Sequence, residues 1–187
     1  MANPLKPLTP LGHDAPLTET IGPVSITENT ATALASLATR LGCQADVALA
    51  AKAAGIPLPG PGRSLSGVTY SAIWLGPEQW MIEAPFATHE DISAILKPIF
   101  LQAASITEQT DAWVRFDLTA PDLPTLFERL CNLDLHRAGV GAATRTVIDH
   151  LGCYVIRRGE TEVSILGPRS SAHSLQHALT SAAKSLF

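Results

Sequence analysis

The clearest pattern of hydrophobic and polar positions lies between residues 106 and 135. From Trp113 to Leu118 apolar and polar side chains alternate, and the apolar face consists of Val114, Phe116 and Leu118. An alternation of period two is typical of a strand that is buried on one face. Thr119 and Asp122 then form a start signal that resembles a capping box, and the apolar stripe that follows it is Leu123, Leu126, Phe127 and Leu130. This segment therefore predicts a strand that leads directly into a helix.

The same rules predict the other elements. Helices are expected where apolar residues recur at helical spacing behind a capping residue, and strands where they alternate between glycine or proline turns. The expected helices are one that begins at Thr30, with Leu34, Leu37 and Leu41 as its stripe and Gly42 as its stop, one at about residues 45–54, one that begins at 88–91 and is ended or kinked by Pro98, and one at about residues 171–186. The expected strands are residues 24–27, 68–75, 79–83, 144–149, 153–157 and 162–166.

Two stretches of the chain share one order of elements. MIEAPFATHEDISAIL, from Met81, and SILGPRSSAHSLQHAL, from Ser164, each hold a strand, a proline after it and a long amphipathic helix. The chain thus reads as two copies of β-α-β-β-α, the split-βαβ or ferredoxin-like unit, which places helices on one face of a sheet. We predict an α+β fold, with one domain over residues 24–187 built of two lobes at about 24–104 and 105–187.

Residues 1–23 differ from the rest of the chain because they contain five prolines. Proline fixes φ and removes a backbone donor, so we expect an extended arm rather than packed secondary structure. Two interpretations stay open, a disordered tail and an arm laid across a neighbouring subunit.

Composition points toward a partner subunit. Charged residues make up 16% of the chain and hydrophobic residues 46%, whereas soluble domains typically have about 25% charged residues. Either the chain is a charge-poor monomer or part of its surface is covered by another chain, and we favour the second interpretation. The net charge of −4 offers no basic field for nucleic acid or an anionic membrane.

The cysteines and the apolar runs suggest a location. Cys43, Cys131 and Cys153 form no C-x-x-C pair, and an odd number argues against a disulfide framework. No signal peptide is evident, and no apolar run approaches the roughly 20 residues that span a bilayer. We expect a soluble, cytoplasmic protein with free, buried thiols.

Four motifs that could carry chemistry fail in their context. His173 and His177 have the spacing of a zinc pair, but Ser174 stands where the catalytic glutamate would be. Gly139–Thr144 lacks the third glycine of a dinucleotide fingerprint and does not follow a strand. The loop at residues 56–67 lacks the spacing of a phosphate-binding loop, and no serine lies in a G-x-S-x-G elbow. We therefore predict no catalytic, cofactor-binding or metal-binding residue.

Trp113, Arg115 and Asp117 form the most informative polar and aromatic group, because the predicted strand places them on one side. Three interpretations stay open. Tryptophan and arginine are enriched at interface hot spots, which favours a partner interface. A solvated sheet face is the plain alternative, and a pocket for a flat anionic ligand such as a pterin-glutamate is the third.

The segment TEQTDAWVRFDLTAPDLPTLFERLCNLDL (residues 107–135), followed by GVGAATRTVIDHLGCYVIRRG (residues 139–159), resembles the gamma subunits of heterotetrameric sarcosine oxidases. The resemblance extends over most of the chain and includes WLGPEQWMIEAP at residues 74–85. More distantly, the order of strand, LTAPD helix and later strand is similar to the folate-binding fold of glycine-cleavage aminomethyltransferases. The resemblance therefore implies a fold like the aminomethyltransferase folate-binding domain.

The resemblance also implies a function. It implies a non-catalytic subunit with a structural or assembly role, in a complex with alpha, beta and delta subunits that oxidises sarcosine to glycine and hydrogen peroxide, with formaldehyde or methylenetetrahydrofolate as the one-carbon product. FAD, FMN, NAD, zinc and tetrahydrofolate are then expected on the partner subunits. One alternative is a small folate-binding aminomethyl-transfer protein, and another is a small subunit of a related N-methylglutamate dehydrogenase. An isolated chain with an uncovered interface is expected to be able to form a homo-oligomer.

Overall fold

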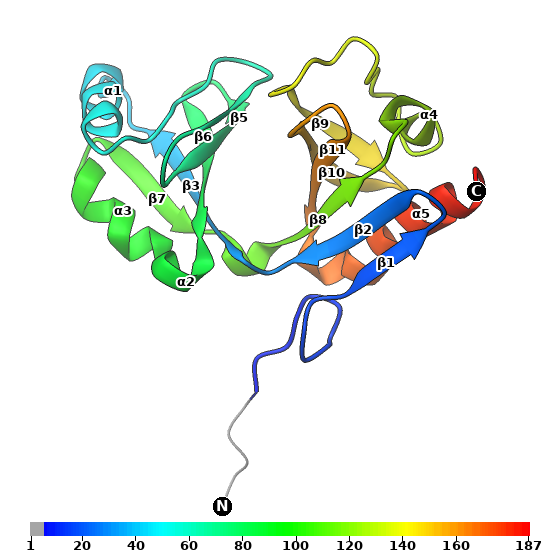
Figure 1. Cartoon of the computed structure of the whole chain (residues 1–187). Coiled ribbons are helices and arrows are strands. Elements are labelled where there is room, and N and C mark those ends of the chain that lie inside the picture. The colour runs from blue at the N-terminus through cyan, green and yellow to red at the C-terminus, as the bar shows by residue number, and fades with distance from the viewer. Residues whose placement is uncertain (1–5) are drawn as a thin grey trace, which may run out of the picture.

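Two antiparallel β-sheets face each other in this computed structural model, which describes residues 6–187 (Figure 1). The six-stranded sheet has the order β1 (Thr18–Ile21), β2 (Val24–Asn29), β8 (Trp113–Thr119), β11 (Glu162–Pro168), β10 (Leu151–Arg157) and β9 (Ala143–Ile148). The five-stranded sheet has the order β4 (Ser64–Ser66), β5 (Ser71–Gly76), β6 (Gln79–Pro85), β3 (Thr32–Thr39) and β7 (Ala104–Glu108). The α+β class predicted from the sequence is confirmed.

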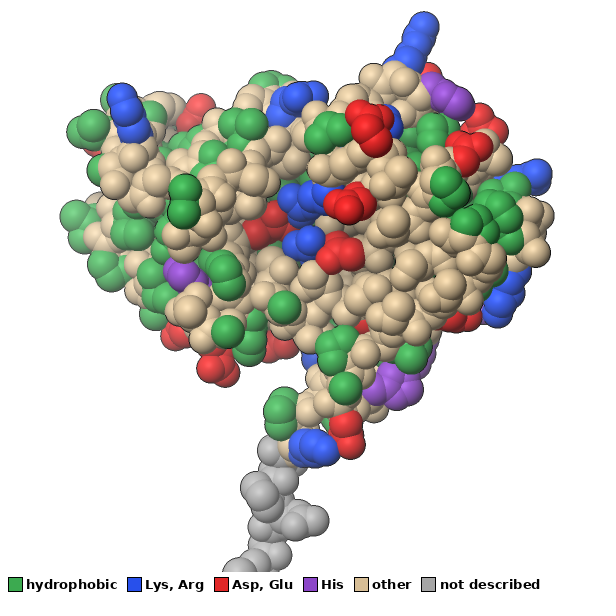
Figure 2. Space-filling view, viewed as in Figure 1, with side chains coloured by type: hydrophobic (Ala, Val, Ile, Leu, Met, Phe, Trp, Pro, Cys, Tyr) green, Lys and Arg blue, Asp and Glu red, His purple; other side chains and the backbone are tan. Residues whose placement is uncertain are grey.

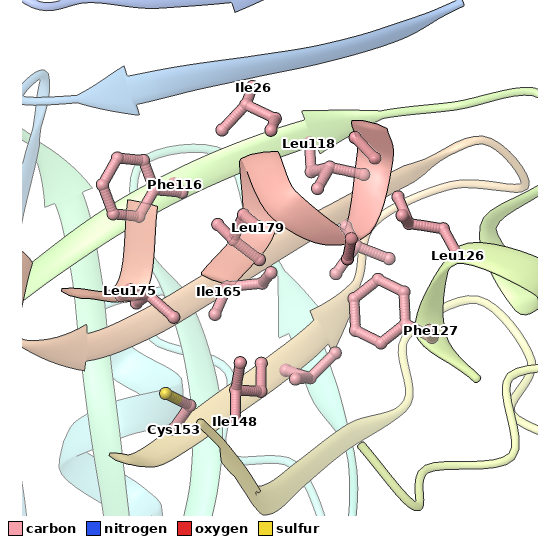
Figure 3. Close-up of a cluster of buried hydrophobic side chains, with 14 of the residues drawn as sticks. Ile26, Phe116, Leu118, Leu126, Phe127, Ile148, Cys153, Ile165, Leu175 and Leu179 are labelled. Carbon is pink, nitrogen blue, oxygen red and sulfur yellow. The ribbon is translucent and has the colours of Figure 1, made fainter. Parts of the chain in front are cut away.

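The helices cover the outer faces of the two sheets (Figure 1). They are α1 (Gln44–Ala53), α2 (Phe86–His89), α3 (Ile92–Phe100), α4 (Leu123–Phe127) and α5 (Ala172–Lys184), with short 3₁₀ turns η1 (Thr110–Ala112) and η2 (Arg169–Ser171). Beneath α5 and α4 lies one core, in which Phe116 and Leu118 of β8 contact Leu175 and Leu179 of α5 (Figure 3). A second core joins α1 and α3 to the five-stranded sheet.

A third cluster holds the inner faces of the sheets together. It consists of Leu34, Ile73 and Met81 from the five-stranded sheet and Ala143, Tyr154, Ile156 and Leu166 from the six-stranded sheet. The two sheets also meet at one edge, where the Ser64 N–H donates to the Gly141 carbonyl and the Ala143 N–H to that of Gly62. Strand alternation thus gives each central strand an outer face under helices and an inner face toward the other sheet.

The predicted helix from Thr30 is wrong, because this stretch is the strand β3. β3 lies between β6 and β7 and is buried on both faces. A strand of that kind is apolar almost throughout and loses the alternation that distinguishes strand from helix. The leucines that suggested a helical stripe lie in three different environments. Leu34 lies between the sheets, Leu37 lies under the helices and Leu41 is exposed beyond the strand.

The N-terminal segment and the lobe boundary differ from expectation in detail. Within the described part of the arm, β1 pairs with β2 and Leu11 is buried in the core beneath α5. The Leu11 N–H donates to the Glu28 carboxylate at 2.9 Å, which ties the arm to its own domain. β2 belongs to the six-stranded sheet and pairs with β8, although the sequence grouped residues 24–104 in one lobe. Long-range pairing of this kind leaves no local signal.

The predicted unit at residues 106–135 is confirmed, with a shorter helix. Val114, Phe116 and Leu118 are buried, and α4 begins after Asp122, whose carboxylate accepts the Thr125 N–H at 3.2 Å. α4 ends at Phe127.

A helix end and a turn differ from the sequence-based expectation. Pro98 lies inside α3, which continues to Phe100. The hairpin between β9 and β10 turns at residues 149–150, where both residues have positive φ, and not at Leu151 and Gly152.

Gly167 of β11 is expected not to tolerate a larger residue. A Cβ added there would lie 2.5 Å from Cδ2 of the fully buried Leu175. Overpacking of this kind typically destabilises by about 1–3 kcal/mol. We expect Gly167→Ala to lower the midpoint of urea unfolding, whereas Gly60→Ala, where a Cβ meets no atom within 4 Å, should leave it nearly unchanged. Equal midpoints for the two variants would contradict the tight packing of α5 on β11.

Candidate functional site

The inner face of β8 carries the side chains that the sequence singled out. Because Val114, Phe116 and Leu118 point toward α5, the alternating residues Trp113, Arg115 and Asp117 share the opposite face. The structure confirms that these three residues share a face. Arg115 and Asp117 look into the space between the two sheets, where they line a cavity.

Four charged side chains meet in this space, and we call them the inter-sheet ionic cluster: Glu83, Arg115, Asp117 and Arg158. The Arg115 Nε donates to the Asp117 carboxylate at 2.7 Å, and its Nη1 lies 3.4 Å from Glu83. The Arg158 Nη2 donates to both oxygens of Glu83, at 2.7 and 2.9 Å. Figure 2 shows blue and red side chains gathered in the hollow between the two halves of the molecule.

The cluster links the two sheets. Glu83 belongs to β6 of the five-stranded sheet, whereas Arg115 and Asp117 belong to β8 of the six-stranded sheet and Arg158 directly follows β10. Glu83 is only 4% exposed, so its charge depends on the two guanidinium groups. A charge in a poorly solvated site is stable only when it is paired and hydrogen-bonded. The cluster therefore joins the two sheets by ion pairs, in addition to the apolar contacts of the third cluster.

Neutral side chains complete the hydrogen bonds of Asp117. The Ser164 hydroxyl on β11 and the Asn29 amide at the end of β2 each donate to this carboxylate at 2.6 Å. Asn29 also accepts the Ala31 N–H, and so shapes the turn from β2 into β3. The chain crosses from one sheet to the other at this turn.

The cavity beside the cluster has a volume of about 640 Å³. It is lined by the cluster and by the loop at residues 66–69, and cavities of this size are typical of small-molecule sites. Within the cluster, two guanidinium groups face two carboxylates, so the charges balance. Arg115 and Arg158 already donate to carboxylates of the chain, and an anionic ligand would have to compete with these bonds.

The surroundings of Asp117 lower its pKa. Burial alone would raise the pKa of this carboxyl, but the charge of Arg115 and the hydrogen bonds from Arg115, Ser164 and Asn29 outweigh it and hold the pKa below the ordinary 3.8. A general base works best with a pKa near the operating pH. Asp117 is therefore suited to a permanent ion pair rather than to proton transfer at neutral pH.

The lowered pKa of Asp117 predicts how stability depends on pH. Because the folded-state pKa lies below the unfolded value, ionised Asp117 stabilises the fold above about pH 3.8, and this contribution is lost as the pH falls through the folded pKa. We expect wild type to exceed Asp117→Asn in free energy of unfolding at pH 6, with the difference shrinking below pH 3.8. Urea unfolding at pH 3 to 6 measures it, and a difference independent of pH would contradict the ion pair.

Trp113 lies beside the cluster in a contact of its own. Its ring packs edge to face on Tyr154, with centroids 5.5 Å apart, and its indole N–H donates to Gln109 at 3.2 Å. These contacts within the chain account for its half-buried position. A partner interface at Trp113, Arg115 and Asp117 stays a prediction.

Sequence reasoning missed Glu83, Arg158, Asn29 and Ser164. Glu83 had a usable signal, because it is the one charged residue in the apolar strand QWMIEAP, and a buried carboxylate needs a partner. The other three have ordinary places at strand ends or on a polar strand face. Nothing local indicates that they meet Glu83 or Asp117, because the contacts span up to 88 positions along the chain.

The remaining candidates lie apart from the cluster. His173 and His177 are exposed on α5, and Gly139–Thr144 comprises the end of a loop and the first two residues of β9. All three cysteines are free, and burial raises the pKa of the Cys153 thiol to about 11. Among residues 6–187, no three His, Cys, Asp or Glu side chains gather in a way that could hold a metal ion, and no helix is long and apolar enough to cross a membrane.

Comparison with known proteins identifies the fold. No protein-family model matches the sequence, and no curated protein matches it. Among solved structures, the chain is similar to a chain of the heterotetrameric sarcosine oxidase from Corynebacterium sp. U-96 in complex with pyrrole 2-carboxylate. The TM-score is 0.76 and the identity 22%, over 87% of this chain and 84% of that chain.

A second similarity is to the glycine cleavage system aminomethyltransferase T from Bartonella henselae, with a TM-score of 0.62 and 13% identity. It covers 81% of this chain but only 44% of that chain. At identities of 22% and 13% the comparisons show a shared fold alone. The chain therefore has an α+β fold of two antiparallel sheets, in common with a chain of heterotetrameric sarcosine oxidase and with part of aminomethyltransferase T.

Proposed function

We propose that this chain is a non-catalytic gamma subunit of a heterotetrameric sarcosine oxidase, with a structural or assembly role. The observation that carries the proposal is the coverage of the structural match. The chain and its sarcosine oxidase counterpart correspond over most of both lengths, at 87% and 84%. The match covers only 44% of the aminomethyltransferase, so more than half of that protein lies outside it. A match over both lengths favours a separate subunit of similar size.

The inter-sheet ionic cluster supports a structural role. Its two arginines are engaged by two carboxylates of the same chain, and Asp117 is held ionised by its neighbours. These side chains stabilise a fixed arrangement of the sheets instead of presenting free groups for a reaction. A rigid two-sheet body is a suitable scaffold for larger subunits.

In this proposal the chemistry belongs to the partners. Alpha, beta and delta subunits would carry FAD, FMN, NAD, zinc and tetrahydrofolate, and would oxidise sarcosine to glycine with formation of hydrogen peroxide. The gamma subunit would contribute surface and rigidity. Its removal is then expected to weaken assembly more than it changes the chemistry of an intact complex.

The test is recovery of the tagged chain from its native cells grown on sarcosine. We expect flavin-containing subunits to co-purify in fixed proportion and to form peroxide when sarcosine is added. Co-expression of the same subunits with and without this chain should then show loss of the assembled complex by native mass spectrometry. A complete and equally heat-stable oxidase without the chain would contradict the assembly role.

A small folate-binding aminomethyl-transfer protein is the second candidate, and the cavity between the sheets is the observation that favours it. Its volume of about 640 Å³ suits a small molecule. Titration of the isolated chain with tetrahydrofolate, followed by tryptophan fluorescence, separates the candidates. Saturable quenching that disappears in Arg158→Met would favour this candidate, because Arg158 lines the cavity.

A small subunit of a related N-methylglutamate dehydrogenase is compatible with the same scaffold role. Here the substrate would be recognised by another chain. Assay of the recovered complex with sarcosine and with N-methylglutamate in parallel distinguishes the two assignments.

A further inference from the structure

The strand β7 ends the five-stranded sheet, and no strand among residues 6–187 pairs with its outer edge. Its register with β3 determines which of its backbone groups are used. The Gln109 N–H donates to the Leu34 carbonyl and the Arg40 N–H to the Ala103 carbonyl, at the two ends of the pairing. In an antiparallel ladder, hydrogen-bonded residues alternate. Residues 103, 105, 107 and 109 therefore face β3, and the backbone groups of residues 104, 106 and 108 point outward.

A groove runs beside this edge. It has a volume of about 840 Å³ and is lined by the start of β7, by the end of α3 and by Arg40. Pro98 and Leu101 form its apolar part, and Lys97 and Arg40 its cationic part. The outward N–H and C=O groups of Ala104 and Ile106 lie along it, so the groove combines backbone partners with side-chain contacts. Those two features together are what an added strand requires.

The cations of the groove lack acidic partners within the described residues. Among residues 6–187, neither Lys97 nor Arg40 lies within ion-pair distance of a carboxylate, and Arg40 donates only to the neutral Gln102 at 2.7 Å. Both side chains are exposed. The groove is thus positively charged although the chain has a net charge of −4. An acidic occupant is complementary to it.

Leu101 marks the same place by its conformation and its exposure. It has φ of 47° and ψ of −120°, a region that glycine adopts freely and a branched side chain adopts at a cost. Its side chain lines the groove and is 73% exposed, so packing within the chain does little to offset the strain. The positive φ ends α3 and starts the turn into β7, a position at which glycine is the usual residue.

We propose that the free edge of β7 binds an extended acidic segment of a partner subunit, which adds a sixth strand to the five-stranded sheet. The identity of the partner rests on the proposed function, whereas the groove and its charge do not. Backbone groups of residues 104, 106 and 108 pair with the added strand. Lys97 and Arg40 contact its carboxylates, and Leu101 contacts its apolar side chains.

A second copy of this chain fits the edge less well. The strand β7, ASITE, has one carboxylate, Glu108. That carboxylate already accepts the Ser93 N–H at 3.0 Å and the Thr110 hydroxyl at 2.5 Å. A second β7 would therefore bring no free carboxylate to Lys97 and Arg40.

Amide hydrogen exchange in the complex recovered with the tagged full-length chain tests the proposal. In the free chain, amides of residues 104, 106 and 108 should exchange rapidly and those of residues 105 and 107 slowly. In the complex, all five should exchange slowly. A complex in which residues 104, 106 and 108 exchange as in the free chain would overturn the proposal and leave the subunit assignment standing.

Substitutions in the groove test the side-chain contacts. Leu101→Gly should raise or maintain the unfolding midpoint, because it removes backbone strain, and should still weaken partner binding. The pair Lys97→Glu and Arg40→Glu should weaken binding by about tenfold. Lys52→Glu on α1 is the matched charge control and should change binding little, since Lys52 does not line the groove. Equal binding by all variants would overturn the proposal.

A peptide probe makes the test independent of the partner's identity. Peptides of six alternating aspartate and valine residues, and of alternating lysine and valine, are titrated into the isotope-labelled full chain. We expect the acidic peptide alone to shift the amide signals of residues 104, 106 and 108. If the tagged chain is recovered without partner subunits, the subunit assignment fails. The peptide titration then still tests whether the groove binds an acidic strand. Absence of these shifts, or protection that grows with chain concentration alone, would overturn the acidic-strand proposal.

Discussion

Glu83→Gln is expected to lower the free energy of unfolding by about 3 kcal/mol. The substitution keeps the shape of the side chain but removes the charge that holds Arg158, at 2.7 and 2.9 Å, and Arg115, at 3.4 Å. Both guanidinium groups would then lie between the sheets without their shared counter-ion. The loss falls at the lower end of the range for breaking a buried ion pair, because both arginines also border the cavity.

Urea unfolding at pH 7 measures this loss. Glu160→Gln is the matched control, since Glu160 pairs with Arg157 at 3.0 Å but its side chain is 82% exposed, and exposed pairs contribute at most about 1 kcal/mol. The double variant Glu83→Gln with Arg158→Met should recover part of the stability, because it removes the unpaired cation. A loss below about 1 kcal/mol for Glu83→Gln would mean that the inter-sheet ionic cluster does not stabilise the fold.

Phe116→Ala is expected to lower the free energy of unfolding by about 3–5 kcal/mol. Phe116 is buried on the outer face of β8, directly behind the strand face that carries Arg115 and Asp117 (Figure 3). Its ring contributes to the core that α5 shares with the six-stranded sheet. Removal of the ring leaves a cavity that a central strand, paired with both β2 and β11, cannot close by moving.

Thermal and urea unfolding of this variant should be compared with Leu49→Ala. Leu49 is an exposed apolar residue of α1, and alanine favours helix, so that substitution should change stability by less than about 0.5 kcal/mol. Because Phe116 lies on the same strand as the cluster, its loss should also broaden the NMR signals of Arg115 and Asp117. A destabilisation no larger than that of Leu49→Ala would contradict the assignment of Phe116 to the core.

Residue patterns predicted the elements whose signals are local. The alternation from Trp113 to Leu118 is sufficient for β8 because one face of this strand meets α5 and the other meets a polar space. The amphipathic pattern of α5 follows in the same way from a surface that is apolar on one side. The hairpin of β5 and β6 was predicted by a different local signal, the turn around Gly76 and Pro77.

Local signals failed where burial is two-sided. β3 has apolar residues on both faces and many alanines, so its sequence favours a helix as much as a strand. Its position between β6 and β7 decides the matter, because both neighbours supply hydrogen bonds along its length. The grouping of β2 with the first lobe has a different cause: its alternation is clear, but only the long-range pairing with β8 assigns it to the six-stranded sheet.

By itself, then, the sequence determined the α+β class and the shared face of Trp113, Arg115 and Asp117. These depend on periodicity, which each segment carries on its own. Only the tertiary structure decided that Glu83 and Arg158 meet Arg115 and Asp117 between the sheets, and that β7 becomes an edge strand beside a cationic groove. Charge pairing and free edges arise from which strands become neighbours, and that choice is made by the packing of the whole chain.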